Sequence, residues 1–314
     1  MATYLVTGGA GFIGSNIVRA LVKERQRVRV IDDLSTGRLI NLEPLYKEID
    51  FYEGSVMDAK LVRKVLKGAD YVLHQAAVPS VARSVADPMR SHEINTTGTV
   101  TVLNEIREHP VRCFVFASSS SVYGNIPKLP KREEFKPDPL SPYAVSKLSA
   151  EYYIRAFANL YNINAVCLRY FNVFGPHQDP LSEYAAVIPR FISLMLKGER
   201  PTIYGDGRQS RDFSYIDNVV SANLLACRNA KNSRGAIANI ACGKRYSLLD
   251  LVCLINTIIG ADIRPRFAPA RTGDVKHSLA SIAAAKKLIR YKPLVGFREG
   301  LVRTVSWMKG SHEA

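Results

Sequence analysis

The chain has 314 residues and 47% of them are apolar, so it is long enough to bury one large hydrophobic core or two smaller ones. No apolar run reaches the roughly 20 residues of a membrane span and no basic signal-peptide start is present, so we expect a soluble cytoplasmic protein that does not bind membranes. The net charge of +15 raises the question of nucleic acid, but the basic residues are spread along the chain without a recognised binding motif, which argues against that partner.

Short β-branched runs alternate with amphipathic helical stretches over the first half of the chain. The predicted strands cover residues 3–8, 27–33, 49–54, 70–77, 113–119 and 164–175. The clearest predicted helices cover residues 12–23, 88–108 and 142–161. Strands separated by crossovers of this length favour a parallel sheet with helices on both faces. We therefore predict an α/β fold with a Rossmann-like doubly wound parallel sheet.

The pattern becomes less regular after residue 175. The predicted elements there are a helix near 185–197, a short strand before "YGDGRQ", a helix after Asp217, a strand at 236–242, a helix near 248–259 and two terminal helices. We predict a first domain over residues 1–175, to which a segment at about 213–245 returns. A smaller mixed α/β substrate-binding domain would take up most of residues 176–314. The five cysteines form no CxxC pair, so neither a disulfide framework nor a metal site is expected.

A glycine-rich segment, "TGGAGFIG", directly follows the first predicted strand and opens the first helix. Gly8, Gly11 and Gly14 allow a tight turn and a close approach to a pyrophosphate at the helix N-terminus. Asp32 and Asp33 end the next strand, 18 and 19 residues past Gly14. A carboxylate there accepts hydrogen bonds from the adenosine ribose and repels a 2′-phosphate. We therefore predict NAD rather than NADP, although the nearby Arg38 weakens that preference.

A tyrosine and a lysine lie four residues apart in "SPYAVSK", in a predicted helix that Ser141 and Pro142 would start. This spacing places Tyr143 and Lys147 on one helix face. An ammonium group nearby stabilises a phenolate, so we expect the pKa of Tyr143 to fall toward neutrality, as a general base requires.

Four consecutive serines, Ser118 to Ser121, end the fifth predicted strand. Open α/β sheets bind ligands at the carboxyl ends of their strands. One serine hydroxyl there is expected to relay a proton between a substrate oxygen and Tyr143. The other three are expected to serve the turn.

Five motifs, "TGGAGFIG", "HQAA", "SSSSVYG", "YAVSK" and "RYFNVFGP", resemble the extended short-chain dehydrogenase/reductase family in its nucleotide-sugar epimerase and dehydratase branch. The resemblance covers nearly the whole chain and is closest to bacterial and archaeal UDP-sugar 4-epimerases, especially those acting on UDP-N-acetylglucosamine. It implies that Ser119, Tyr143 and Lys147 are catalytic. In the family's mechanism, tyrosinate removes the proton of the sugar 4-hydroxyl while hydride passes to NAD. The 4-keto sugar then rotates and takes hydride back on its other face.

The same resemblance separates related reactions. Dehydratases of this branch carry an Asp-Glu pair just before "VYG", and decarboxylases usually carry a Glu in that turn. Here Ser119, Ser120 and Ser121 occupy those positions, so epimerisation fits best. A net nucleotide-sugar oxidoreductase and a non-catalytic NAD-binding regulator remain as alternatives.

The resemblance also implies a set of cofactor-binding residues. These are Gly8, Gly11, Phe12, Ile13, Gly14, Asp32, Asp33, Ser35, Thr36, Gly37, Ser55, Val56, Gln75, Ala76, Ala77, Asn95, Tyr143, Lys147 and Tyr170. Ser55 replaces the Asp that family members usually place beside the adenine, and a serine accepts a hydrogen bond more weakly than a carboxylate does.

The implied residues for the UDP-sugar are Pro79, Ser119, Asn172, Val187, Thr202, Tyr204, Arg211, Arg271, Asp274 and Ser278. Arg211 and Arg271 match diphosphate-contacting positions, and Asn172 resembles a residue that meets the substrate phosphate. Ser278 matches a position that is a large Tyr in members restricted to non-acetylated sugars, so it hints at N-acetylated or dual specificity.

Three matters stay open at the level of sequence. UDP-galactose, UDP-N-acetylgalactosamine and UDP-glucuronate are not ranked as substrates. Pro79 stands where family members often have Gly or Lys, with an unknown effect on the sugar pocket. The resemblance suggests a homodimer formed through the predicted helices 88–108 and 142–161.

Overall fold

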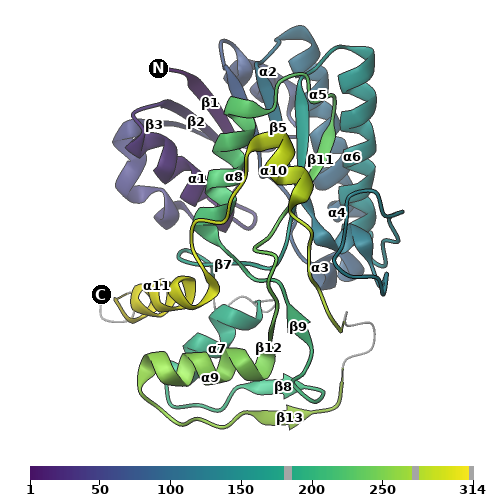
Figure 1. Cartoon of the computed structure of the whole chain (residues 1–314). Coiled ribbons are helices and arrows are strands. Elements are labelled where there is room, and N and C mark those ends of the chain that lie inside the picture. Colours follow the sequence, from purple (N-terminus) through teal and green to yellow (C-terminus); the bar gives the residue numbers. More distant parts are fainter. Residues whose placement is uncertain (180–185, 271–275, 311–314) are drawn as a thin grey trace.

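The computed structural model describes residues 1–179, 186–270 and 276–310, and its main feature is a seven-stranded sheet (Figure 1). In chain order its strands are β1 (Thr3–Thr7), β2 (Arg27–Asp32), β3 (Ile49–Glu53), β4 (Tyr71–His74), β5 (Cys113–Ser119), β6 (Ala165–Tyr170) and β11 (Ala236–Ile240). They lie in the order β11-β6-β5-β4-β1-β2-β3, and every neighbouring pair is parallel. The predicted doubly wound parallel sheet is confirmed.

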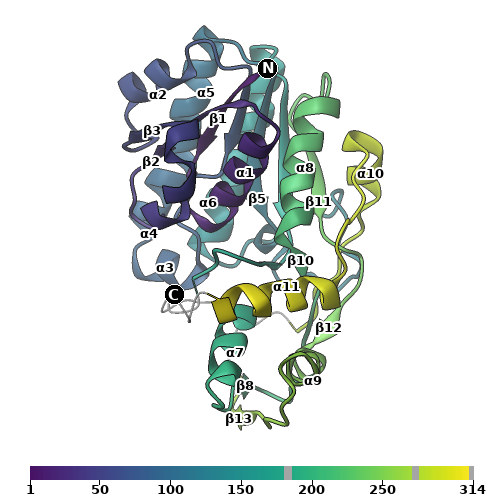
Figure 2. The same ribbon diagram turned by 90° about the vertical axis from the view of Figure 1, so that its left-hand side faces the viewer.

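Helices cover both faces of this sheet (Figures 1 and 2). One face carries α1 (Phe12–Lys23), α8 (Ile216–Asn229) and α10 (Ala283–Ile289); the other carries α2 (Ala59–Leu66), α5 (Gly98–Glu108) and α6 (Pro142–Leu160). Successive strand residues join different apolar clusters, as Leu5 does on the α2 side and Val6 on the α1 side. Because both faces are buried, the strands read as nearly continuous apolar runs.

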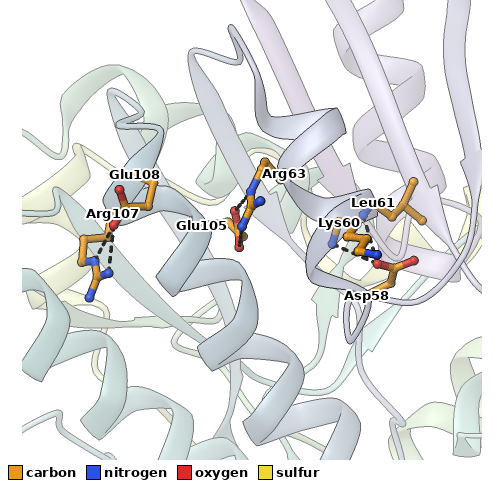
Figure 3. Close-up of polar contacts among 7 residues, drawn as sticks. All are labelled: Asp58, Lys60, Leu61, Arg63, Glu105, Arg107 and Glu108. Atoms are coloured by element: carbon orange, nitrogen blue, oxygen red, sulfur yellow. Dashed lines mark hydrogen bonds and ion pairs between the residues drawn. The ribbon is translucent and has the colours of Figure 1, made fainter.

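Ionic and capping contacts fix the helices of the second face (Figure 3). Asp58 caps α2, accepting from the backbone N–H groups of Lys60 at 2.9 Å and Leu61 at 3.1 Å. Arg63 of α2 donates to both carboxylate oxygens of Glu105 on α5, at 2.9 and 3.1 Å. Glu105 is only 1% exposed, whereas the side chain of Arg63 is 59% exposed, so the pair links the two helices where a buried carboxylate meets the surface.

Two predicted elements are interrupted in the structure. The predicted helix 88–108 consists of α4 (Pro88–His92), a π-helical turn (Glu93–Thr97) and α5. The prediction of a single strand over residues 164–175 was wrong, because this segment forms two strands, β6 and β7 (Val173–Phe174). The break falls at Asn172, whose φ of 36° lies in the left-handed region that no strand residue adopts. β7 pairs with β10 (Ser214–Tyr215) instead of extending the main sheet.

The remaining elements are short or lie below the sheet in Figure 1. Two 3₁₀ turns (Leu39–Asn41 and Glu43–Glu48) precede β3, α3 (Val81–Ala86) follows β4, and another 3₁₀ turn (Ser120–Tyr123) follows β5. The lower part contains α7 (Val187–Leu196), α9 (Leu248–Ile259), α11 (Phe297–Gly310) and two strand pairs. These pairs are β8 (Thr202–Tyr204) with β13 (Arg266–Ala268), and β9 (Ser210–Arg211) with β12 (Tyr246–Ser247). Within the described ranges, no helix has both the length and the apolar character to cross a bilayer.

Candidate active site

A cavity of about 360 Å³ lies at the carboxyl ends of the central strands. Its lining includes Gly8, Gly11, Phe12, Ile13, Gly14, Asp32, Asp33, Ser35, Thr36, Val56, Gln75, Ala76, Ala77, Pro79, Tyr143, Lys147 and Tyr170, all of them predicted from the sequence. Open parallel sheets bind their ligands at this edge, so the topology itself brings these residues together.

The junction of β1 and α1 forms the wall of the cavity that fits a pyrophosphate. Gly8 has a φ of 67°, and its N–H donates to the carbonyl of Ile31 at 2.8 Å. A Cβ added to Gly14 would lie 2.1 Å from the Gly8 carbonyl oxygen, so only glycine allows the helix to start this close to the strand. Gly11 makes no side-chain cap for α1. Gly11 and the first-turn residues Phe12, Ile13 and Gly14 line the cavity, so the N-terminus of α1 lies where a phosphate would bind.

Two carboxylates stand at the end of β2. Asp32 is buried and accepts from the backbone N–H groups of Ala10 and Leu34, both at 2.9 Å. Burial raises its pKa. Asp33 accepts from the backbone N–H of Ser35 at 3.0 Å and from its hydroxyl at 2.6 Å. These bonds shape the loop after β2 and leave both carboxylates in the cavity lining, where ribose hydroxyls would find acceptors.

Lys147 reaches the cavity from α6. The helix begins at Ser141, whose side chain accepts from the N–H of Ala144 at 3.2 Å. The Lys147 Nζ donates to the carbonyl of Ala117 at 2.8 Å. Burial lowers the pKa of Lys147 to about 7, and the negative charge of Glu151 opposes that fall. The ammonium group is thus fixed against the end of β5.

Tyr143 lies one helical turn before Lys147 and shares a hydrogen bond with Ser119. Burial raises the pKa of Tyr143, and the bond with Ser119 only opposes this rise. The expectation of a tyrosine pKa lowered toward neutrality is therefore wrong for the protein by itself. The reason is that burial penalises the charged forms of both side chains and so weakens the effect of the lysine.

The serine run divides into different roles. Ser118 lines the cavity and donates to Glu151 at 2.5 Å, so it does not simply serve the turn. The Ser119 hydroxyl accepts from the Ser121 hydroxyl at 2.9 Å and from its backbone N–H at 3.2 Å. Ser119 ends β5 in extended conformation, and the turn that follows presents its hydroxyl to Tyr143.

Three described residues predicted to bind the cofactor lie outside the cavity lining: Gly37, Ser55 and Asn95. Asn95 accepts from the N–H of Val78 at 2.8 Å and donates to the Ser146 hydroxyl at 3.0 Å, so it ties the loop after β4 to α6. The Ser55 hydroxyl accepts from the N–H of Met57 at 3.2 Å. Both side chains support the walls of the cavity.

Among the described residues predicted to bind the substrate, Pro79 is in this lining, whereas Asn172, Val187, Thr202, Tyr204, Arg211 and Ser278 are not. The Asn172 amide donates to the Asp212 carbonyl at 3.0 Å and to the Ser278 hydroxyl at 3.1 Å, so the structure joins two predicted residues directly. Arg211 lies in β9 and donates to the Ser210 carbonyl at 3.1 Å. Thr202 is the first residue of β8 and Tyr204 is its last, and Val187 is the first residue of α7. Arg271 and Asp274 lie outside the described residues.

Several cavity residues were missed from the sequence. They include Arg83, Ser118, His177, Gln178 and Asp179. His177 follows directly on "FNVFGP", which was a signal that could have been used. Burial lowers its pKa to about 4, so it is neutral near pH 7. Ser118 was missed because its partner Glu151 is 33 residues away and only the fold brings the two together.

The chain matches the model of the NAD dependent epimerase/dehydratase family over residues 4–241. It is 42% identical to the UDP-N-acetylglucosamine 4-epimerase of Methanobrevibacter ruminantium, solved with UDP-N-acetylmuramic acid, with a TM-score of 0.94 and 99% of each chain covered. It is 38% identical to the UDP-glucose 4-epimerase of Thermotoga maritima, solved with UDP-glucose, with a TM-score of 0.93 and 99% of each chain covered. The UDP-glucose 4-epimerase of Mycolicibacterium smegmatis is 35% identical over 313 residues, which span 98% of this chain and 99% of that protein.

Proposed function

This chain belongs to the NAD dependent epimerase/dehydratase family, and on that premise we propose that it is a UDP-sugar 4-epimerase, an isomerase that inverts C4 of a UDP-hexose. One observation favours epimerisation over the other reactions of this family. Ser119 and Tyr143 are hydrogen-bonded beside Lys147, and the turn after β5 holds serines where elimination would need carboxylates. The group can move a proton to and from a hydroxyl, which is what inversion at C4 requires.

The glycine loop and the two aspartates after β2 would hold NAD, because they fit its pyrophosphate and adenosine ribose. NAD, when bound, supplies a nicotinamide that accepts hydride and returns it. Tyr143, in its phenolate form, takes the proton of the sugar 4-hydroxyl and later gives it back. Ser119 orients the same sugar oxygen, and the Lys147 ammonium stabilises the tyrosinate.

The choice of sugar is proposed to depend on Ser278. Its hydroxyl accepts from the Asn172 amide, so this position couples to the residue proposed to meet the substrate phosphate. A serine leaves room for an N-acetyl group, which favours UDP-N-acetylglucosamine and UDP-N-acetylgalactosamine, with UDP-glucose and UDP-galactose also accommodated. UDP-glucuronate remains the alternative substrate. Arg211 and residues 176–314 in general are proposed to form the UDP-sugar side, and residues 1–175 the NAD side.

The protein is further proposed to be a cytoplasmic homodimer. Apolar side chains are exposed on the helices expected to form the interface, with 65% of Met89 in α4 and 58% of Tyr152 in α6 accessible to solvent. Val85 of the neighbouring α3, which was not part of the expected interface, is also 65% exposed. Exposed apolar residues concentrated on adjoining helices are typical of protein interfaces.

The direct experiment is to incubate the purified protein, without added cofactor, with a panel of UDP-sugars and to assay for the 4-epimers. An epimerase recycles its bound NAD, so we expect product under these conditions. Tyr143→Phe should remove at least about three orders of magnitude of kcat while leaving the fold intact, because it deletes the proton-carrying hydroxyl. Turnover only with added NADH or NADPH would indicate a net oxidoreductase instead.

A further inference from the structure

Behind the serine run, three buried side chains join β5, α6 and β6. The Ser118 hydroxyl donates to Oε1 of Glu151 at 2.5 Å. Arg169, the register partner of Ser118 on β6, donates to both oxygens of the same carboxylate, at 2.9 and 2.7 Å. None of the three residues is more than 3% exposed. A buried carboxylate that accepts two hydrogen bonds from one guanidinium group and a third from a hydroxyl is held in one orientation.

This buried group lies directly behind the proposed catalytic residues. Ser118 precedes Ser119 and itself lines the cavity. Glu151 lies one helical turn beyond Lys147 and two turns beyond Tyr143, on the same side of α6. The bond from Ser118 to Glu151 therefore ties the strand that ends in the proposed catalytic serine to the helix that carries the base.

Glu151 also acts on Lys147 through its charge. Burial lowers the pKa of Lys147 to about 7, and the negative charge of Glu151 opposes that change. The other titratable groups near this pair are Tyr143 on α6, His74 on β4, and Cys167 and Arg169 on β6. Burial keeps the first three uncharged near pH 7, and Arg169 is a cation. Among these described neighbours, Glu151 is thus the negative charge that favours a protonated lysine.

We propose that Glu151 is a positioning residue for the C4 inversion, a role that deepens the proposed function and rests on it. Arg169 holds its carboxylate in place through two hydrogen bonds, at 2.9 and 2.7 Å. Through the Ser118 hydroxyl, Glu151 fixes the end of β5 and with it Ser119. Through its charge, it keeps Lys147 cationic beside the tyrosine.

Two variants separate these effects. Ser118→Ala removes one hydroxyl and leaves the ion pair intact, so we expect kcat to fall about tenfold while KM stays within roughly twofold. Glu151→Gln also removes the charge. We expect it to move the alkaline limb of the kcat pH profile by about one unit toward acid, because Lys147 then loses its proton earlier.

A titration that needs no substrate measures the same charge effect. The pH dependence with which Lys147 reacts with an amine reagent, followed by mass spectrometry, should show a lower pKa in Glu151→Gln. Glu105→Gln is the matched control, because Glu105 is a similarly buried carboxylate that also binds an arginine through two bonds, but outside the cavity lining (Figure 3). We expect it to lower stability and to leave kcat and its pH profile unchanged.

The role of Glu151 is wrong if Ser118→Ala lowers kcat no more than Glu105→Gln does. It is also wrong if neither the pH profile nor the labelling titration shifts in Glu151→Gln. Should that variant fail to fold, because Arg169 is left buried without its partner, Ser118→Ala against the control decides the matter. A wild-type protein that inverts no UDP-sugar would contradict the proposed function instead, and the labelling titration would still decide whether Glu151 controls the charge of Lys147.

Discussion

Burial sets the protonation of individual side chains around the cavity. It raises the pKa of Tyr143 and lowers that of Lys147 to about 7, so burial disfavours the charged form of each side chain. The hydrogen bond with Ser119 and the charge of Glu151 act in the opposite direction. The proposed base therefore depends on a small number of contacts, and removing any one of them should be visible in the pH dependence of activity.

His74 makes the stability of the protein sensitive to acid. It is fully buried, and its ring nitrogens lie 2.7 Å from the Thr7 hydroxyl and 3.0 Å from the Thr99 hydroxyl. Burial lowers its pKa from 6.5 to about 3. Between these two values the unfolded chain binds a proton that the folded protein does not, so the free energy of unfolding falls as the pH falls.

We expect this histidine to contribute a loss of about 3 kcal/mol between pH 6.5 and pH 4. Urea unfolding of wild type and His74→Gln at several pH values measures it. The variant should have a smaller free energy of unfolding than wild type at pH 7, and this free energy should fall less on acidification. An equal loss in both proteins would mean that other groups cause the acid sensitivity.

Ser278 offers a test of sugar choice at a single residue. Ser278→Tyr is expected to abolish turnover of UDP-N-acetylglucosamine and to spare UDP-galactose, because the larger side chain fills the space proposed for the N-acetyl group. Ser278→Ala removes the hydrogen bond with Asn172 without adding volume, so it separates the effect of side-chain size from the effect of losing that bond. We expect this variant to keep its activity on both sugars. Initial rates with the two substrates decide, and equal loss of both in the tyrosine variant would contradict this role.

At the scale of elements, the β1–α1 junction is the feature most closely tied to cofactor binding. Gly14→Ala would bring a Cβ within 2.1 Å of the Gly8 carbonyl oxygen, so strand and helix must separate. We expect the purified variant to retain less than about a tenth of the wild-type NAD, because the helix N-terminus moves away from the pyrophosphate. Quantifying NAD released on denaturation measures this. Gly296→Ala, where the new Cβ meets nothing within 4 Å, should retain NAD fully.

The sequence predicted some elements to the residue and others only in part. The bounds of α1, β5 and α9 agree with the prediction because apolar periodicity and flanking turn residues define them locally. The break at Asn172 was not foreseen, because it depends on a side-chain bond to residue 212 across the fold.

The candidate site was likewise predictable only where neighbouring residues in the sequence define it. Motif spacing located the glycine loop and the Tyr143 helix, whereas the bond between Ser118 and Glu151 exists only once β5 and α6 are packed together.

At the scale of the whole molecule, the net charge of +15 suits a protein that binds two anionic ligands, although charge alone identifies neither. The exposed apolar side chains on α3, α4 and α6 form the face on which the proposed dimer would assemble.

Sedimentation of wild type and Met89→Glu tests the proposed dimer. We expect wild type to sediment as a dimer and the variant as a monomer, because a charge in the centre of an apolar interface has to be desolvated. Leu294→Glu is the matched control, since Leu294 is also 65% exposed but lies outside these helices. A monomeric wild type, or a dimer unaffected by Met89→Glu, would place the interface elsewhere or remove it.

The most direct measurement follows the hydrogen at C4 itself. UDP-N-acetylglucosamine and UDP-glucose carrying deuterium at C4 are incubated with the purified protein without added cofactor, and the products are examined by nuclear magnetic resonance. Inversion by removal and return of this hydrogen within one active site predicts 4-epimers that keep the deuterium at C4. Loss of the label to water, or the absence of any 4-epimer, would contradict the proposed function.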